Sequence, residues 1–202
     1  MENILKFVEI ITLMKKNPAL FGLLVSIFVF LGAFGIYFLF LAKKNEYLVD
    51  NPSDKTYYFK INNDAEKIIA PGQFLKVDLH QGQNKIQVFD GEKKPLYDSA
   101  FQVKKVRGLI NISNADYYIN TQYYGYNINK DSLLVALGKT MIDGKPYFGA
   151  PKKFSKIYTD DFYYNVEEDY DRVIKNIDKV ESRSKIFRKQ DYFNYYKEYY
   201  NF

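Results

Sequence analysis

The stretch APGQFLKVDLHQGQNKIQVFDG, residues 70–91, decides the fold class of this chain. Apolar and polar residues alternate on both sides of a central glycine turn, so we predict a β-hairpin in which each strand has one buried face. On the first strand this pattern predicts that Leu75, Val77 and Leu79 face the core. The only histidine, His80, falls on the opposite face, so we expect it to face solvent near the turn and not to bind a metal.

The same alternation continues from residue 47 to about residue 124. Residues 56–61 (TYYFKI) and 85–89 (KIQVF) repeat it, and clusters of Gly, Pro, Asn and Asp separate the short runs. Turns at a spacing of roughly eight to twelve residues are typical of a small sandwich. The sequence therefore predicts an α+β chain, with a β-rich, sandwich-like domain over residues 47–160 and a helical segment over residues 161–202.

Residues 70–91 resemble the small PEGA-type sandwich modules of bacterial envelope proteins. In those modules a Pro-Gly turn precedes a strand pair of the form apolar-x-apolar-x-x-G-x-x-x-apolar-x-apolar. The positions that carry the resemblance are Pro71, Gly72, Val77, Leu79, Gly82, Ile86 and Val88. The resemblance implies an interaction or spacer module outside the cytoplasm, without catalytic residues.

Residues 19–42 (ALFGLLVSIFVFLGAFGIYFLFLA) contain no charged side chain. A helix of this length reaches about 36 Å, slightly more than the ~30 Å hydrocarbon core of a bilayer. The run is too long for a signal peptide and ends without a small-x-small cleavage site, so we predict an uncleaved transmembrane helix. Small residues could let a second helix approach closely, although glycine is also common in membrane spans; they are Gly22, Ser26, Gly32 and Gly35.

The orientation of this span does not follow from charge, because three lysines precede it and three follow it closely. A short N-terminal segment before an uncleaved span indicates a signal anchor. We therefore expect a single-pass protein of the plasma (inner) membrane with its large C-terminal part outside the cytoplasm. Residues 1–18 are amphipathic and are expected to lie in the membrane interface or to pack on a partner.

Two further strands are predicted at residues 132–138 (SLLVALG) and 139–149 (KTMIDGKPYFG). Asp143-Gly144 within the second is a strong hairpin signal. A helix is predicted over residues 167–180, with Asn165 as its N-cap and apolar residues at helical spacing. We expect this helix to cover one face of a sheet and to belong to the core.

The chain ends in KQDYFNYYKEYYNF, whose aromatic residues gather on about half of a short helix. Packing on the domain and docking on a partner are both compatible with this composition. The expectation adopted here is that residues 190–202 dock a partner and are dispensable for folding. The docking residues would be Tyr192, Phe193, Tyr196, Tyr199 and Tyr200.

The chain offers little that indicates catalysis. A net charge of +5 from 29 basic and 24 acidic residues is too mixed to predict a nucleic-acid partner, and the absence of cysteine removes thiolate metal sites. The one catalytic pattern is a carboxylate pair, Asp160 or Asp161 with Glu167 or Glu168, as in glycoside hydrolysis. Helix capping and solvation explain these residues better, and no cofactor is expected.

The sequence thus favours a membrane-anchored envelope protein whose β-rich domain is a structural or interaction part of a membrane assembly. Its expected partners are the lipid bilayer and a membrane protein or further copies of the chain. One alternative is an anchored module that binds glycans or peptides through exposed tyrosines. The other is a carboxylate-dependent hydrolase.

Overall fold

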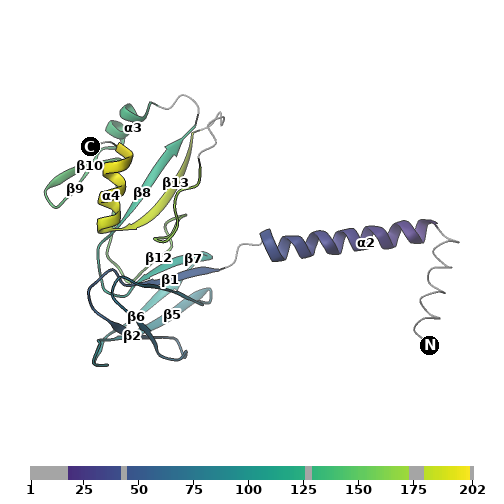
Figure 1. Cartoon of the computed structure of the whole chain (residues 1–202), viewed down its shortest axis with the longest axis horizontal. Coiled ribbons are helices and arrows are strands. Elements are labelled where there is room, and N and C mark those ends of the chain that lie inside the picture. Colours follow the sequence, from purple (N-terminus) through teal and green to yellow (C-terminus); the bar gives the residue numbers. More distant parts are fainter. Residues whose placement is uncertain (1–17, 42–44, 126–128, 173–179, 201–202) are drawn as a thin grey trace. The chain divides into compact units, whose positions relative to one another are not determined.

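The computed structural model describes residues 18–41, 45–125, 129–172 and 180–200. The chain divides into two units, residues 1–44 and residues 45–202 (Figure 1). The expected boundary at residue 160 does not separate two domains, because the C-terminal strand and helix belong to the second unit. The amphipathic prediction for residues 1–18 lies outside the described residues, except for Pro18.

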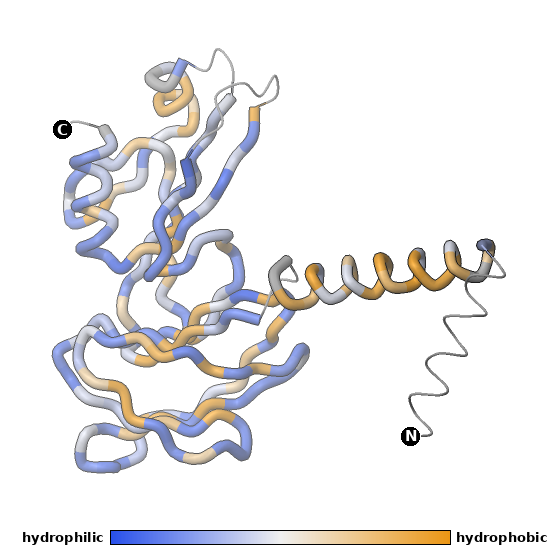
Figure 2. Tube along the Cα trace, turned by 45° about the vertical axis from the view of Figure 1, so that its right-hand side comes forward, coloured by the Kyte–Doolittle hydropathy of each residue, from blue (hydrophilic) through white to orange (hydrophobic). Residues whose placement is uncertain are grey.

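The first unit is an apolar helix. Helix α2 spans Pro18–Ile36 and continues as a π-helix, η1, over Tyr37–Leu41. Figure 2 shows α2 as an almost unbroken apolar tube. The stretch Phe21–Leu39, which continues from α2 into η1, has a mean hydropathy of 2.3, and none of it is buried. By length and composition, this stretch is sufficient to cross a membrane. Ala42, the last residue of the predicted span, lies outside the described residues.

In its described residues, the second unit contains three larger sheets and one hairpin. The outer sheet has the order β3-β2-β5-β6, formed by Lys67–Ile69, Tyr57–Ile61, Gly82–Phe89 and Pro95–Val103. The central sheet has the order β12-β7-β1-β4, formed by Tyr158–Thr159, Arg107–Asn111, Glu46–Asp50 and Phe74–Val77. The third sheet has the order β11-β8-β13, formed by Lys152–Phe154, Tyr117–Tyr124 and Glu181–Arg188.

The outer and central sheets share one apolar core, as the alternating sequence predicts. Val49 and Ile110 from the central sheet meet Phe59 and Ile86 from the outer sheet, and all four are fully buried. Each strand of the outer sheet supplies alternate residues to this core, which leaves its other face to solvent. Strands β1 and β7 pair in parallel, because the chain traverses the whole outer sheet between them.

The central sheet is buried on both faces. Leu48 and Leu109 point away from the first core and pack with Tyr117, Ile119 and Ile186 of the third sheet. The other face of the third sheet is covered in turn by α4 and by the β9–β10 hairpin, through a core that includes Tyr118, Ile142, Phe187, Tyr192 and Tyr196. Helix α4 spans Lys189–Tyr200, and the hairpin strands span Lys139–Ile142 and Lys145–Phe148.

Several predicted elements are confirmed. The hairpin turns at Asp143 and Gly144, which adopt φ values of 50° and 76°, as a tight two-residue turn requires. The helix near the C-terminus is also present, as α4. Leu75, Val77 and Leu79 pack in the first core and His80 is exposed, so the predicted faces of the first strand in the opening stretch are correct. The predicted hairpin is wrong, because each strand pairs with partners elsewhere in the sequence: β4 pairs with β1 in the central sheet, and β5 pairs with β2 and β6 in the outer sheet.

Residues 132–138, predicted as a strand, instead belong mostly to helix α3, Lys130–Leu137. Asn129 caps this helix, because its side chain accepts a hydrogen bond from the Ser132 amide at 3.0 Å. Gly138 ends the helix with a φ of 83°. A short apolar run fits a strand and a helix equally well, and the cap decides between them.

The predicted helix over residues 167–180 is also corrected. Residues 166–167 form a turn and residues 168–172 are not helical, whereas residues 173–179 lie outside the described residues. The Glu168 carboxylate accepts a hydrogen bond from the Asn165 amide at 2.6 Å, as in a helix cap, but it also binds Arg107 at 2.9 Å. Strand β13 then follows, because its eight residues find a partner along β8 that the local sequence does not show.

The register of the opening stretch gives a first prediction. Leu79→Ala removes a buried side chain and is expected to lower the free energy of unfolding by about 2 to 5 kcal/mol. His80→Ala is the matched control: it removes an exposed ring whose main contact is the Gln83 carbonyl at 2.9 Å, and should cost less than about 1 kcal/mol. Urea unfolding of the two variants measures the difference, and equal losses would contradict the register.

Candidate functional site

A buried carboxylate joins the central sheet to the third sheet. Asp50, at the end of β1, is fully buried and accepts hydrogen bonds from the Tyr117 hydroxyl at 2.6 Å and from Arg188 Nε at 3.0 Å. Arg188 Nη2 also donates to Asp50 Oδ1 and, at 2.9 Å, to the carbonyl of Gly72. Sheet pairing places Arg188 directly opposite Tyr117, so both reach the same carboxylate.

This environment changes the acidity of both partners of Asp50. Burial raises the pKa of Tyr117 well above its usual range, and the negative charge of Asp50 adds to the effect. The hydrogen bond to Asp50 raises the pKa of Arg188. The phenol therefore stays neutral and the guanidinium stays charged, which is the pairing that a buried carboxylate needs.

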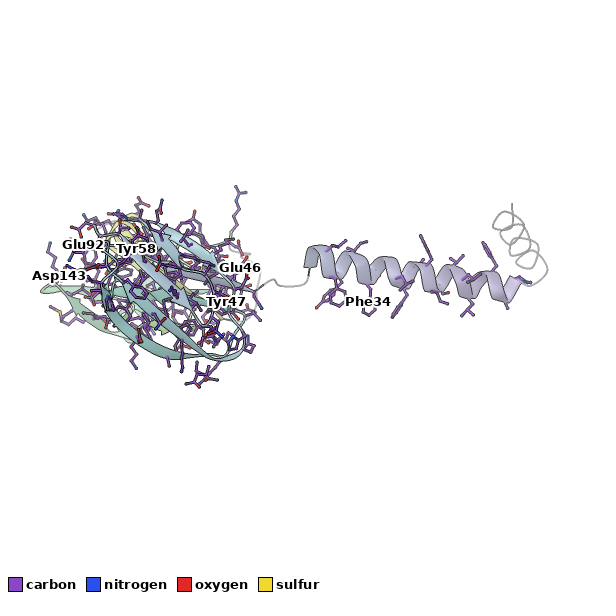
Figure 3. All side chains as sticks on the ribbon, turned by 90° about the horizontal axis from the view of Figure 1, so that it is seen from below. Phe34, Glu46, Tyr47, Tyr58, Glu92 and Asp143 are labelled. Carbon is purple, nitrogen blue, oxygen red and sulfur yellow. The ribbon has the colours of Figure 1, made fainter. Side chains whose placement is uncertain are left out.

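The candidate functional site is the end of the domain at which β1 begins. We call it the β1 end and define it by Glu46, residues 104–107, Asp160 and Tyr163. Figure 3 shows Glu46 and Tyr47 at one end of the domain and Tyr58, Glu92 and Asp143 toward the other. The Glu46 amide donates to the Val106 carbonyl at 2.8 Å, so the loop between β6 and β7 lies beside the first residue of β1.

Arg107 forms ion pairs with two carboxylates at the β1 end. Its guanidinium binds Glu46 at 2.6 Å and Glu168 at 2.9 Å, and it also donates to the Tyr163 carbonyl. The guanidinium carbon lies 5.7 Å from the centre of the exposed Tyr163 ring, within the range of a cation–π contact. Arg107 thus holds the segment that precedes β13 against the central sheet.

The loop over residues 104–106 is held from two sides. Asp160 accepts hydrogen bonds from the amides of Lys104 and Lys105, each at 3.2 Å. The Lys105 carbonyl accepts from the Tyr47 hydroxyl at 2.9 Å. Burial raises the pKa of Tyr47 and nearby Asp160 adds to this shift, so the hydroxyl remains a donor over the physiological range.

Three of the four carboxylates considered for hydrolysis are engaged in these contacts. Asp160 caps the loop, Asp161 lies 3.3 Å from the Lys105 ammonium, and Glu168 is shared by Arg107 and the Asn165 amide. Glu167 has its pKa raised, chiefly by burial. In the described ranges, no group of three or more His, Cys, Asp or Glu side chains is arranged to hold a metal ion.

The residues predicted to mediate helix packing are dispersed around α2. The Ser26 hydroxyl donates to the Gly22 carbonyl at 2.8 Å, which places the two on one face. At about 100° per residue, Gly32 lies about 80° and Gly35 about 140° from Gly22 around the helix axis. The four do not form one stripe, and a helix partner for this unit stays a prediction.

The residues predicted to dock a partner are partly core residues. Tyr192 is fully buried and Tyr196 is 6% exposed, and the Tyr192 ring stacks on Tyr118 with centroids 5.4 Å apart. Phe193 is half-buried and stacks on Tyr147, whereas Tyr199 lies at the surface. The Tyr200 side chain lies outside the described residues. The expectation that residues 190–202 are dispensable for folding is therefore wrong for Tyr192 and Tyr196.

Exposed tyrosines do not surround a binding groove in the described part of the chain. Many tyrosines of the domain instead have a structural role. The buried ones include Tyr47, Tyr57, Tyr117, Tyr118, Tyr164, Tyr192 and Tyr196. One open depression has a volume of about 680 Å³. It lies on the solvent face of the outer sheet and is lined mainly by polar side chains, among them Asn62, His80, Lys85, Gln87 and Asp98.

No protein-family model, no curated protein and no solved structure matches this chain. The functional argument therefore depends on the chain's own residues and geometry.

The network at Asp50 gives a second prediction. Arg188→Met leaves the buried Asp50 without its cation and is expected to lower the free energy of unfolding by about 3 to 5 kcal/mol. The neighbouring Lys189 pairs with Asp143 at 2.8 Å in an exposed position, so Lys189→Met should cost under about 1 kcal/mol. Urea unfolding of both variants makes the comparison, and a tolerated Arg188→Met would show that the third sheet is held mainly by apolar contacts.

The burial of α4 gives a third prediction. Tyr192→Ala should lower the free energy of unfolding by about 3 to 5 kcal/mol, because it empties the centre of the core between α4 and the third sheet. Tyr199→Ala, on the exposed side of α4, should cost less than about 1.5 kcal/mol. Thermal unfolding followed by near-ultraviolet circular dichroism measures both, and a stable Tyr192→Ala variant would restore the docking interpretation of this helix.

Proposed function

We propose that this chain is a single-pass membrane protein whose β-rich domain is a structural or interaction module of a membrane assembly. The observation that carries the proposal is α2 with its extension η1, an apolar, charge-free helix whose Phe21–Leu39 stretch is not buried by any other part of the structure. Exposing so many apolar side chains to water is unfavourable, and a bilayer removes that cost.

The β-rich domain supports this role by its construction. It has three apolar cores of its own, and residues 45–202 form one compact unit. Three of the four carboxylates considered for hydrolysis, Asp160, Asp161 and Glu168, form loop hydrogen bonds and ion pairs that fix the β1 end. We therefore favour a binding or scaffolding role without catalysis, with a membrane protein or further copies of the chain as partner.

The alternative of a module that binds glycans or peptides through exposed tyrosines has less support. The tyrosines serve mainly as core residues, and the open depression at Asn62 and His80 is lined by amides and charges. The resemblance of residues 70–91 to PEGA-type modules remains a prediction. Residues 70–91 contribute β4 to the central sheet and β5 to the outer sheet, so they do not form the strand pair that the resemblance implies.

The membrane anchor and its direction give a fourth prediction. After alkaline carbonate washing, the full chain should stay with the membrane pellet, because α2 spans the bilayer. Protease added to intact spheroplasts should remove the region after residue 44 and leave an N-terminal tag untouched. Release by carbonate would contradict the anchor, and protection of the domain until the membrane is broken would reverse the orientation.

The assembly itself is tested in the same membranes. Short amine-reactive crosslinkers, applied before detergent, should give a defined higher-mass product that contains this chain. The matched control is the chain from residue 45 onward, secreted without its anchor, which should give much less of that product. Monomer alone at all crosslinker concentrations would contradict the assembly role.

A further inference from the structure

Strand β6, Pro95–Val103, forms a long edge of the outer sheet. In the described part of the chain its one strand partner is β5, on the other side. The remaining edges of the three larger sheets are two to four residues long, except for β13. The chain itself covers the edge of β13, because the amides of Tyr163 and Tyr164 each donate to the Ser184 carbonyl at 3.0 Å. Among the described strands, β6 is therefore the long edge that stays available.

The hydrogen bonds of β5 show which backbone groups of β6 face outward. The Lys85 amide donates to Asn62 Oδ1 at 2.9 Å, and the Lys85 carbonyl accepts from the Asn62 amide at 2.9 Å. Both groups of Lys85 thus face β2, so its partner Ala100 directs its own N–H and C=O away from β5. The alternation of an antiparallel pair gives Asp98 and Gln102 the same direction.

This edge lacks most of the features that protect edge strands from pairing. Natural edges are blocked by lysines, prolines, bulges or short length. In β6, Pro95 and the bulge lie at the start of the strand, and residues 97–103 contain one charged side chain, Asp98. The side chains of Asp98, Ala100 and Gln102 are exposed to solvent. A long, regular edge of this kind is suited to accept another strand.

The outward groups of β6 match those of a second β6. Donors and acceptors that alternate along an edge are satisfied by an extended polypeptide, and two copies of one strand related by a two-fold axis are antiparallel. With the axis at Ala100, Ala100 pairs with Ala100 of the second copy, and Asp98 pairs with Gln102 of that copy. This register uses every outward group of residues 98–102 and forms about six hydrogen bonds.

The side chains favour the same register. The Asp98 carboxylate lies opposite the Gln102 amide of the second copy, so an acceptor meets a donor on each side of the axis. The small Ala100 side chains meet at the axis and leave room for the strands to approach. An axis at Asp98 would instead place two carboxylates opposite each other, which is unfavourable.

We propose that two copies of this chain pair through β6, antiparallel and with Ala100 at the two-fold axis. The two outer sheets then form one continuous sheet across the dimer. This inference rests on the proposed function, because it names a second copy as the partner of the interaction module. Anchoring both copies in one membrane raises their effective concentration and favours the pairing.

The test uses the absence of cysteine from this chain. Ala100→Cys gives the full chain a single thiol at the axis, where the two Cα atoms would lie about 5.5 Å apart, within the reach of a disulfide. Lys85→Cys is the matched control, because Lys85 is exposed and directly opposite Ala100 on β5. Its two thiols would be about three strand spacings apart, or about 15 Å.

Both variants are oxidised in native membranes with copper phenanthroline and separated on non-reducing gels. Ala100→Cys should give a disulfide-linked dimer as its main product, and Lys85→Cys less than about a tenth of that yield. Equal yields from the two variants would indicate random collisions and overturn the inference.

A charge exchange tests the register. In the Ala100→Cys chain, Gln102→Asp places a carboxylate opposite Asp98 on each side of the axis and should lower the dimer yield about fivefold. Adding Asp98→Lys makes the same contacts attractive and should restore the yield. A yield that neither substitution changes would overturn the pairing of Asp98 with Gln102.

The outcomes separate this inference from the proposed function. If Ala100→Cys gives no dimer while the amine-reactive crosslinkers still give their higher-mass product, pairing through β6 is wrong and the assembly role stands. If that thiol also resists a maleimide in the membrane, a strand of another protein covers the edge, and the second copy is the wrong occupant. The absence of both crosslinked products would contradict the proposed function and this inference together.

Discussion

The buried ion pair of Asp50 and Arg188 is the constraint on which the arrangement of the sheets depends. The two residues are 138 positions apart, and Arg188 also binds the carbonyl of Gly72 in the turn between β3 and β4. A buried ion pair adds little net stability over an apolar contact of the same shape, but losing one partner is costly. The pair therefore selects one register in which β13 can meet the ends of β1 and β4.

This constraint explains why so many aromatic residues are found inside the domain. With the third sheet placed on the central one, β8 and β13 are covered on both faces, so successive residues such as Tyr117 and Tyr118 are both buried. Tyrosine suits these positions because its ring fills the space between layers and its hydroxyl finds a polar partner. The tyrosines are thus mainly structural.

The β1 end combines rigidity with proximity in sequence to α2. Arg107 binds carboxylates from β1 and from the segment before β13, which fixes the end of the domain nearest in sequence to α2. The attachment between the two units is short, because five peptide steps join Leu41, the last helical residue, to Glu46, the first residue of β1.

Local patterns in the sequence determined the elements whose structure depends on near neighbours. The uncharged run became α2, the alternation in residues 70–91 became two strands with one buried face each, and Asp143-Gly144 became a hairpin turn, because periodicity and turn chemistry act within a few residues. The pairing of those two strands was not determined locally, because β4 and β5 lie in different sheets. Of the candidate site, sequence reasoning singled out Asp160, Asp161 and Glu168, but as a possible catalytic pair. It did not find Arg107, Val106 or Tyr163, because no local sequence pattern shows that these residues lie near Glu46.

Tertiary contacts alone decided the remaining features. Residues 181–188 became a strand because β8 was available to pair with them, and Tyr192 became a core residue because the third sheet lies beneath α4. Gly108 is required because the Tyr158 ring packs where a Cβ atom would lie, 2.3 Å from its hydroxyl oxygen. In the sequence, Asp50 looks like an ordinary polar residue at the end of a strand. It can be buried only because Arg188, 138 residues away in the sequence, binds its carboxylate. Contacts between residues so distant in sequence leave no local pattern, because each partner's own neighbourhood is compatible with several structures.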